Sequence, residues 1–151
     1  MQDVENLFCR YKDDVYRLAL SYTRNTQEAE DACQTVFLKL MEQKDIVPGK
    51  ERAWLMQVTA NTCRNLLRSS WWKKTVELDE TVAAPERADT GVYQAVMGLT
   101  PKYRVVVYLY YYECCSTREI ADILKISQNT VTTRLGRARA MLRQQLKEVS
   151  L

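Results

Sequence analysis

The sequence STREIADILKISQNTVTTRLGRARAML, residues Ser116 to Leu142, places two short apolar helical patterns next to each other. The apolar positions are Ile120, Ala121, Ile123 and Leu124 in the first pattern, and Val131, Leu135, Ala138, Leu142 and Leu146 in the second. The residues between them are Lys125, Ile126 and Ser127, of which Ser127 can cap the second helix. Because so short a connection makes two helices cross at a steep angle, the stretch predicts a helix-turn-helix.

The outward face of the second helix carries short polar side chains and arginine. Helical projection places Asn129, Thr132, Thr133, Gly136 and Arg137 opposite the apolar stripe. Such side chains suit base edges and phosphates in a DNA major groove. Residues 125–147 include six bases and no acid. Cations favour a helix C-terminus, but bases also occupy the first half of this helix, so DNA recognition is favoured over a solvated basic face.

The first half of the chain predicts a unit of three helices. Apolar residues at three- and four-residue spacing predict helices near 4–22 and 25–41, with Asn25 as the N-cap of the second. Pro48-Gly49 breaks the chain, and a third helix follows over about 51–73. Amphipathic helices bury their apolar stripes against each other, so these three form one compact unit.

The second half predicts a separate helical unit. An acidic stretch with Pro85 predicts a linker at 75–90. A short helix near 92–97 follows, and then an apolar helix from Pro101, after the N-cap Thr100, to Tyr112. The fold class is therefore all-α, with two small helical domains at 1–74 and 91–151.

A second basic surface is predicted on the third helix. Its stripe contains Gln57, Asn61, Arg64 and Arg68, with Asn65 beside it. Trp71, Trp72, Lys73 and Lys74 extend it. Arginines, amides and aromatic rings can bind phosphates and stack on bases that have left a duplex, although Trp71 and Trp72 are equally suited to capping a hydrophobic core. Two such units predict that two segments of one DNA are read together.

Composition limits the possible functions. The 151 residues are 46% hydrophobic and 27% charged, with four Gly, three Pro and a net charge of +3, as in helix-rich globular proteins. No stretch approaches the roughly 20 apolar residues that span a bilayer, and acids near the start oppose a signal peptide, so we expect a cytoplasmic protein. The chain has no histidine and no Cys-x-x-Cys pair, so we expect no metal site, no cofactor and no small-molecule substrate.

Cysteines give little sign of chemistry. The five are Cys9, Cys33, Cys63, Cys114 and Cys115, and each lies within an apolar helical pattern. Small buried thiols are therefore expected. A redox switch at the adjacent Cys114 and Cys115 is the alternative.

Three stretches together resemble the extracytoplasmic-function (ECF) group of bacterial RNA polymerase sigma factors, in the sigma-70 family. They are AEDACQTVFLKL from Ala29, RAWLMQVTANTCRNLLR from Arg52, and LTPKYRVVVYLYYYECCSTREIADILKISQNTVTTRLGRARAML from Leu99. The resemblance covers nearly the whole chain. It implies a promoter-melting domain (region 2) at 1–74 and a −35-reading domain (region 4) at 91–151, joined by a linker that threads into polymerase.

The resemblance also implies roles for individual residues. The residues implied to contact the β′ clamp helices of core polymerase are Glu30, Asp31, Gln34 and Phe37. The residues implied to contact the −10 element are Asn61, Arg64, Asn65 and Arg68, with Lys73 and Lys74 extending that surface. The residues implied to contact the −35 element are Asn129, Thr130, Thr132, Thr133, Arg134 and Arg137. The further partners implied are the polymerase β flap, promoter DNA and an anti-sigma factor, which in this family can be membrane-bound.

Three positions depart from the family pattern. Lys125 stands where a turn glycine is usual, which predicts a left-handed residue at a cost of about 1 kcal/mol. Gly136 replaces a larger side chain and leaves the base preference there open. Asn65 replaces the usual aspartate.

Two other functions are weighed against a sigma factor. An autonomous helix-turn-helix regulator would bind operator DNA tightly without polymerase. An enzyme using Cys114 or a tyrosine of YLYYY lacks a nearby base, and we expect no catalysis.

Overall fold

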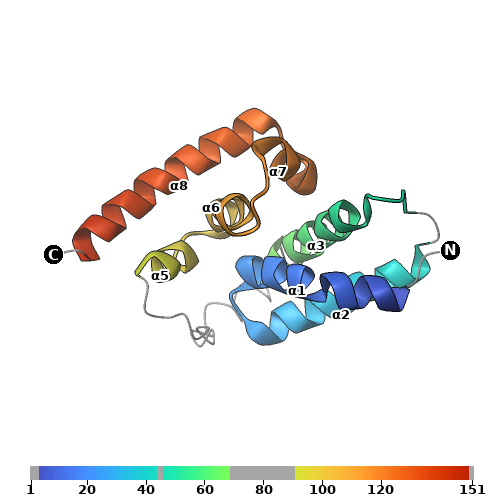
Figure 1. Cartoon of the computed structure of the whole chain (residues 1–151). Coiled ribbons are helices and arrows are strands. Elements are labelled where there is room, and N and C mark those ends of the chain that lie inside the picture. Colours follow the sequence, from blue (N-terminus) through green and yellow to red (C-terminus); the bar gives the residue numbers. More distant parts are fainter. Residues whose placement is uncertain (1–3, 44–45, 69–90, 150–151) are drawn as a thin grey trace. The chain divides into compact units, whose positions relative to one another are not determined.

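The computed structural model describes residues 4–43, 46–68 and 91–149, and every regular element within these ranges is helical (Figure 1). The chain divides into two compact units, one containing α1 to α3 and the other α5 to α8. The predicted all-α fold with two helical domains is confirmed. The predicted linker at 75–90 lies outside the described residues.

The first unit is a bundle of α1 (Val4–Thr23), α2 (Thr26–Glu42) and α3 (Glu51–Arg68), and each helix contacts the other two. Its core consists of Leu7, Val15, Val36, Phe37, Leu40, Ile46 and Leu55. All three helices contribute to this cluster, each through the apolar stripe that its sequence pattern predicted. Burying one such side chain stabilises the fold by about 1.5–3 kcal/mol, so the shared core sets how α2 and α3 present their polar faces.

A fixed corner joins α1 to α2. Arg24 has a φ of 55°, and its backbone N–H donates to the Leu20 carbonyl at 2.8 Å, which ends α1. The Asn25 side chain accepts a hydrogen bond from the Glu28 N–H at 2.9 Å and so caps α2 as predicted. The corner is thus set by local hydrogen bonds.

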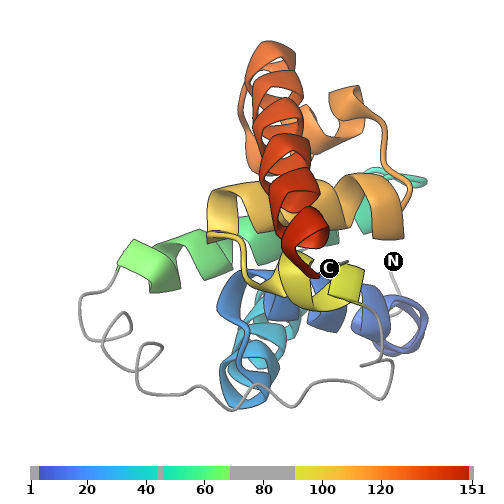
Figure 2. The same cartoon turned by 90° about the vertical axis from the view of Figure 1, so that its left-hand side faces the viewer.

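The second unit contains α5 (Gly91–Met97), α6 (Pro101–Val107), η1 (Tyr108–Tyr112), α7 (Thr117–Leu124) and α8 (Gln128–Val149). Its buried apolar residues include Val96, Leu99, Val105, Val106, Leu109, Ile120, Ile123, Leu124, Val131, Leu135 and Ala138. Helix α8 contacts α5, α6 and α7, and Figure 2 shows it as the long helix of this unit. The shorter helices therefore form the platform that holds α8.

The helix predicted from Pro101 to Tyr112 differs from the prediction. It is an α-helix to Val107 and a π-helical turn from Tyr108 to Tyr112. The Glu113 N–H donates to the Tyr108 carbonyl at 3.2 Å, five residues back. Apolar spacing does not distinguish a π-turn from an α-helix over five residues, because both bury a residue such as Leu109 on one side.

Cysteine burial also differs in part from the prediction. Cys63 and Cys115 are buried and Cys33 is half-buried, but Cys9 and Cys114 are exposed. Cys9 lies off the buried stripe of α1, and Cys114 follows the π-turn with a left-handed φ of 56°. The expectation of buried thiols is therefore wrong for these two.

Candidate nucleic-acid and protein interfaces

The helix-turn-helix is built from a capped α7 and a left-handed residue. Ser116 and Glu119 form a reciprocal capping box, in which the Glu119 N–H donates to Ser116 Oγ at 3.1 Å and the Ser116 N–H donates to Glu119 Oε1 at 2.8 Å. Lys125 has φ 57° and ψ 47°, which confirms the predicted left-handed conformation. The Ile126 N–H then donates to the Ala121 carbonyl at 3.1 Å, closing the turn.

The start of α8 is also fixed by side chains. Ser127 Oγ accepts a hydrogen bond from the Thr130 N–H at 3.0 Å, so Ser127 is the predicted cap. Gln128 Nε2 donates to Thr117 Oγ1 at 2.8 Å and ties the first turn of α8 to that of α7. The angle between the two helices is therefore held from both ends of α7.

The structure brings all six predicted −35 residues onto the first half of α8. Asn129, Thr132, Thr133 and Arg137 are exposed, and Thr130 and Arg134 are half-buried. Val131, Leu135 and Ala138, on the opposite stripe, are buried. The hydroxyl of Thr132 donates to the Gln128 carbonyl at 3.0 Å. This face offers short polar groups and two guanidinium groups, which suits contact with base edges and phosphates.

A tyrosine of α6 lies next to this face. Hydrogen bonding to Arg137 and the positive charges of Lys102 and Arg137 hold the pKa of Tyr103 below its ordinary value, against a smaller opposing effect of burial. Lys102 Nζ lies 5.1 Å from the centre of the Tyr103 ring. Sequence reasoning did not find Tyr103 or Lys102, because they come near α8 only through the packing of α6.

The predicted −10 residues of α3 that the structure describes lie on one polar face. Asn61, Asn65 and Arg68 are exposed, and Arg64 is half-buried. The remaining two, Lys73 and Lys74, lie outside the described residues. Behind this face, Lys39 Nζ of α2 donates to Thr62 Oγ1 at 3.2 Å. The bond links the polar surface of α3 to the neighbouring helix.

The four predicted polymerase contacts lie on α2, but they are not alike. Glu30, Asp31 and Gln34 are exposed, whereas Phe37 is only 6% exposed. Phe37 packs edge-on against Phe8 of α1, with ring centroids 4.7 Å apart. Phe37 therefore belongs to the core and reaches the surface only as part of a groove wall.

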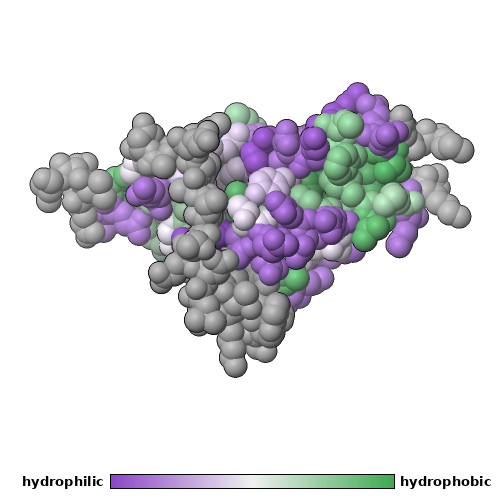
Figure 3. Space-filling view, turned by 90° about the horizontal axis from the view of Figure 1, so that it is seen from below, coloured by the Kyte–Doolittle hydropathy of each residue, from purple (hydrophilic) through white to green (hydrophobic). Residues whose placement is uncertain are grey.

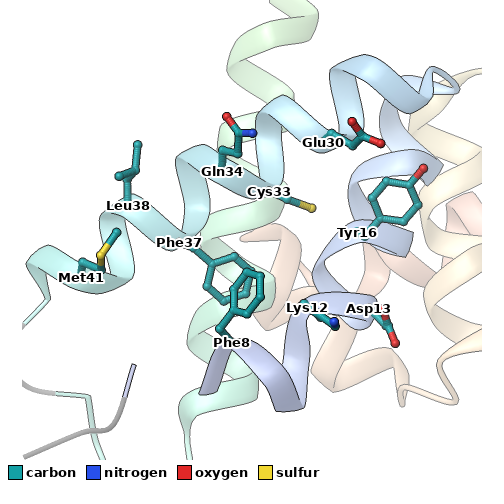
Figure 4. Close-up of a pocket in the computed structure, with 10 residues that line it drawn as sticks. All are labelled: Phe8, Lys12, Asp13, Tyr16, Glu30, Cys33, Gln34, Phe37, Leu38 and Met41. Atoms are coloured by element: carbon teal, nitrogen blue, oxygen red, sulfur yellow. The ribbon is translucent and has the colours of Figure 1, made fainter. Parts of the chain in front are cut away.

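That groove runs between α1 and α2 and has a volume of about 760 Å³. Figure 4 shows the ten side chains that line it, with Phe8 and Phe37 facing each other and Glu30 and Tyr16 at the other end. Phe8, Leu38 and Met41 are 42%, 57% and 59% exposed, and Figure 3 shows hydrophobic residues gathered on the surface of this unit. Exposed apolar groups of this size are typical of a surface that binds protein.

Burial and a neighbouring acid alter the chemistry inside the groove. Burial, together with the negative charge of Glu30, raises the pKa of the Cys33 thiol to about 11. Burial also raises the pKa of Tyr16, with smaller contributions from Glu30 and Cys33. Both groups are therefore neutral near pH 7, and Cys33 is a poor nucleophile there.

A helix-turn-helix, a second unit with a basic polar helix face and an apolar groove are together typical of a DNA-binding protein that also binds protein. Comparison with known proteins agrees with this class. The family model "Sigma-70 region 2" matches residues 7–73, and the model "Sigma-70, region 4" matches residues 91–142.

Individual relatives show the same kinship. The RNA polymerase sigma factor SigV of Bacillus subtilis (strain 168) is 30% identical over 149 residues, which cover 93% of this chain and 89% of SigV. The ECF RNA polymerase sigma factor SigW of the same organism is 31% identical over 163 residues, covering 92% of this chain and 86% of SigW.

Solved structures share the fold. The sigma factor RpoE from Bartonella quintana, in complex with the anti-sigma factor NepR, superposes with a TM-score of 0.78 at 18% identity, covering 97% of this chain and 98% of that one. CnrH, in complex with the cytosolic domain of CnrY, gives a TM-score of 0.65 at 24% identity, covering 96% and 88%.

The chain belongs to the sigma-70 family, in its ECF group. It is an RNA polymerase sigma factor that acts with core polymerase in transcription initiation and has no enzymatic activity of its own. Among the residues that the structure describes, no helix is long and apolar enough to cross a membrane. The same residues contain no cluster of three or more side chains suited to holding a metal ion.

Proposed function

We propose that the exposed face of α8 reads the −35 element of the promoter through Asn129, Thr130, Thr132, Thr133, Arg134 and Arg137. The observation that carries this proposal is that the turn between α7 and α8 fixes the orientation of α8 while the polar face of α8 stays at the surface. Caps and the left-handed Lys125 fix α8, while its first half leaves short polar and arginine side chains at the surface. Arg137 is the residue best suited to a base or phosphate, because guanidinium binds two acceptors at once.

The −10 element is assigned to the polar face of α3. Asn61, Arg64, Asn65 and Arg68 can contact the backbone and the bases of a strand that has left the duplex. Lys73 and Lys74, which lie outside the described residues, belong to the same basic stretch of the sequence. Capture of unstacked bases there would offset the cost of opening the promoter.

Core polymerase is assigned to α2. Glu30, Asp31 and Gln34 would bind the β′ clamp helices through their exposed polar groups, and Phe37 would support the apolar groove beside them. The C-terminal unit would contact the β flap. An acidic row beside exposed Leu38 and Met41 combines electrostatic steering with apolar contact, as protein interfaces commonly do.

The remaining assignments complete the proposal. The domain limits are 1–74 and 91–151, with 75–90 as the linker between them. The protein works in the cytoplasm, where bacterial polymerase is. An anti-sigma factor, of a kind that can be membrane-bound, holds this sigma factor inactive. The complexes of RpoE with NepR and of CnrH with the cytosolic domain of CnrY support this proposal by analogy.

Polymerase binding tests the role of α2. Asp31→Ala should weaken the affinity for purified core polymerase by about tenfold, because it removes a charge from the interface. Glu42→Ala, which removes an exposed charge from the end of the same helix, is the matched control. Equal affinities of Asp31→Ala and the unmodified chain would remove Asp31 from the interface.

Run-off transcription tests the role of α8. Arg137→Ala should lower initiation from a promoter with both elements while the protein stays folded, because Arg137 is exposed. Arg143→Ala removes an exposed arginine from later in α8 and serves as the control. Unchanged transcription by Arg137→Ala would contradict the assignment. Tight promoter binding by the free chain, without any response to polymerase, would instead favour an autonomous regulator.

A further inference from the structure

A cluster of two tyrosines and one arginine joins the π-turn η1 to the middle of α8. Arg139 Nε donates a hydrogen bond to the hydroxyl of Tyr111 at 2.7 Å. The guanidinium carbon lies 5.5 Å from the centre of the Tyr110 ring and 5.7 Å from that of the Tyr111 ring. The two rings meet edge-on, 4.9 Å apart. We call Tyr110, Tyr111 and Arg139 the arginine cage.

The two tyrosines of the cage are adjacent in the chain, and both lie in the π-turn. Neighbouring residues on a regular α-helix point in directions about 100° apart and do not share a partner easily. The turn Tyr108–Tyr112 is wider, with the Glu113 N–H bonded to the Tyr108 carbonyl five residues back. Isolated π-turns are frequently found at functional sites, and this one directly precedes the helix-turn-helix.

The position of Arg139 on α8 connects the cage to the proposed −35 surface. Arg139 follows Thr132 by seven residues and Gly136 by three, so the three lie along one side of the helix. The cage therefore lies on the side of α8 that carries Thr132, about two turns further along the helix. A bond at this point fixes the rotation and direction of α8 relative to the segment before α7, in addition to the caps at its start.

The chemistry of the cage favours a fixed arginine over a mobile one. Cation–π contact and a hydrogen bond to a phenol hold the planar guanidinium in one orientation. The hydrogen bond to Tyr111 is also the main cause that raises the pKa of Arg139 above its ordinary value. An arginine in a basic DNA-facing helix would otherwise be counted as one more phosphate contact.

We propose that Arg139 is a positioning residue for promoter recognition, which acts by locking α8 onto the π-turn through Tyr110 and Tyr111. This inference rests on the proposed −35-reading role of α8. Its consequence is specific: breaking the cage impairs discrimination between a correct and an altered −35 element, while general attraction to DNA is retained.

The test uses the full chain assembled with core polymerase and duplex DNA from a promoter found by run-off transcription. Affinity is measured for the correct and a scrambled −35 element over a range of salt concentrations. Tyr111→Phe removes one hydroxyl, and Arg139→Lys keeps the charge but loses the Nε bond and the planar group. Tyr112→Phe, which removes a hydroxyl from the same turn, is the control for Tyr111→Phe, and Arg143→Lys is the control for Arg139→Lys. Tyr112 stacks on Tyr108, with ring centroids 5.9 Å apart.

Both cage variants should lower the affinity for the correct element by about fivefold, the effect of losing one ordinary hydrogen bond. Affinity for scrambled DNA and the salt dependence should stay unchanged, and so should the folded fraction measured by circular dichroism. The two control variants should behave like the unmodified chain.

Three results would overturn the inference. Arg139→Ala could weaken binding to both DNAs equally and reduce the salt slope by about 0.9, which is the signature of a phosphate contact. The cage variants could lose binding only in proportion to a lost folded fraction, which means a purely structural role. They could also discriminate between the two DNAs like the unmodified chain.

Arg137→Ala in the same assay separates failure of the cage from failure of the proposed −35 surface. If Arg137→Ala is equally without effect, the proposed −35 surface fails as well; if Arg137→Ala impairs discrimination, only the cage is rejected.

Discussion

Helices α3 and α8 both carry a basic polar face, but they are held in different ways. Helix α3 contacts α1 and α2 and buries Leu55, Met56, Thr59, Ala60, Thr62 and Cys63. Helix α8 buries one narrow stripe, of which Val131, Leu135 and Ala138 are the fully covered members. Helix α3 thus belongs to a three-helix core, whereas α8 packs against its neighbours through a narrower buried stripe.

This difference affects what each surface can tolerate. On α3, the half-buried Arg64 lies next to the buried Thr62 and Cys63 in the chain, so a substitution there risks the packing of the bundle. On α8, Asn129, Thr133 and Arg137 are exposed. Substitution of these exposed side chains should therefore have little effect on stability, whereas the half-buried Thr130 and Arg134 of the same helix resemble Arg64 in this respect.

The largest expected effect comes from a cavity in one hydrophobic core, which should destabilise one unit and leave the other unchanged. Leu135→Ala should destabilise the second unit by about 3 kcal/mol, because the side chain is 2% exposed and its removal leaves a cavity. Leu55→Ala should do the same in the first unit, where Leu55 is fully buried. Hydrogen exchange measured by mass spectrometry should show faster exchange in 117–146 for the first variant and in 51–68 for the second. Loss of protection spread equally over both units would contradict two separate cores.

A smaller effect tests the left-handed turn between α7 and α8. Lys125→Gly should raise the free energy of unfolding by about 1 kcal/mol, because glycine adopts φ 57° without steric cost. Lys125→Ala removes the same charge but keeps the steric cost, so it should bring no gain. Urea unfolding compares the three proteins. Equal stability of the Gly and Ala variants would show that the left-handed turn is not strained.

Gly136 tests whether the exposed face of α8 tolerates a larger side chain. A Cβ at this position meets no heavy atom within 4 Å, and glycine inside a helix costs about 0.5–1 kcal/mol relative to alanine. Gly136→Ala should therefore stabilise the protein by that amount in urea unfolding. Ala140→Gly, at an exposed position one turn later, should lose a similar amount. A destabilised Gly136→Ala would show that the open space is occupied.

The smallest expected effect is a difference in alkylation rate between exposed and buried cysteines. Cys9 and Cys114 are exposed and should be alkylated first at pH 8. Burial raises the pKa of Cys63 to about 12 and that of Cys33 to about 11. These two thiols are therefore almost entirely protonated at pH 8, and they should react more slowly because the thiolate is the nucleophile. Peptide mapping after timed alkylation measures the order, and early modification of Cys63 would contradict it.

The sequence predicted the features that depend on local patterns. The Ser127 cap follows from residues within four positions of each other, and the left-handed Lys125 follows from the resemblance to the family, in which a turn glycine is usual there; the structure confirms both. Helical spacing also predicted the buried Val131, Leu135 and Ala138 of α8, whereas Leu142 and Leu146 of the same stripe are half-buried.

Features created by packing between elements were not predictable in this way. Helical spacing places Met41 on the same side of α2 as the buried Phe37, but Met41 is 59% exposed and lines the groove with Phe8 of α1. The arginine cage depends on a contact between Tyr111 and Arg139, which are 28 residues apart in the chain. A single-helix pattern contains no information on such contacts.

The most direct test of the account combines protein and promoter substitutions in run-off transcription with core polymerase. Arg137→Ala and Asn61→Ala are each paired with a changed −35 and a changed −10 element, which makes four double-mutant cycles. The account predicts coupling of about 1–3 kcal/mol between Arg137 and the −35 element and between Asn61 and the −10 element, with additivity in the two crossed pairs. Additive effects in all four cycles would contradict the claim that α8 and α3 read these two elements.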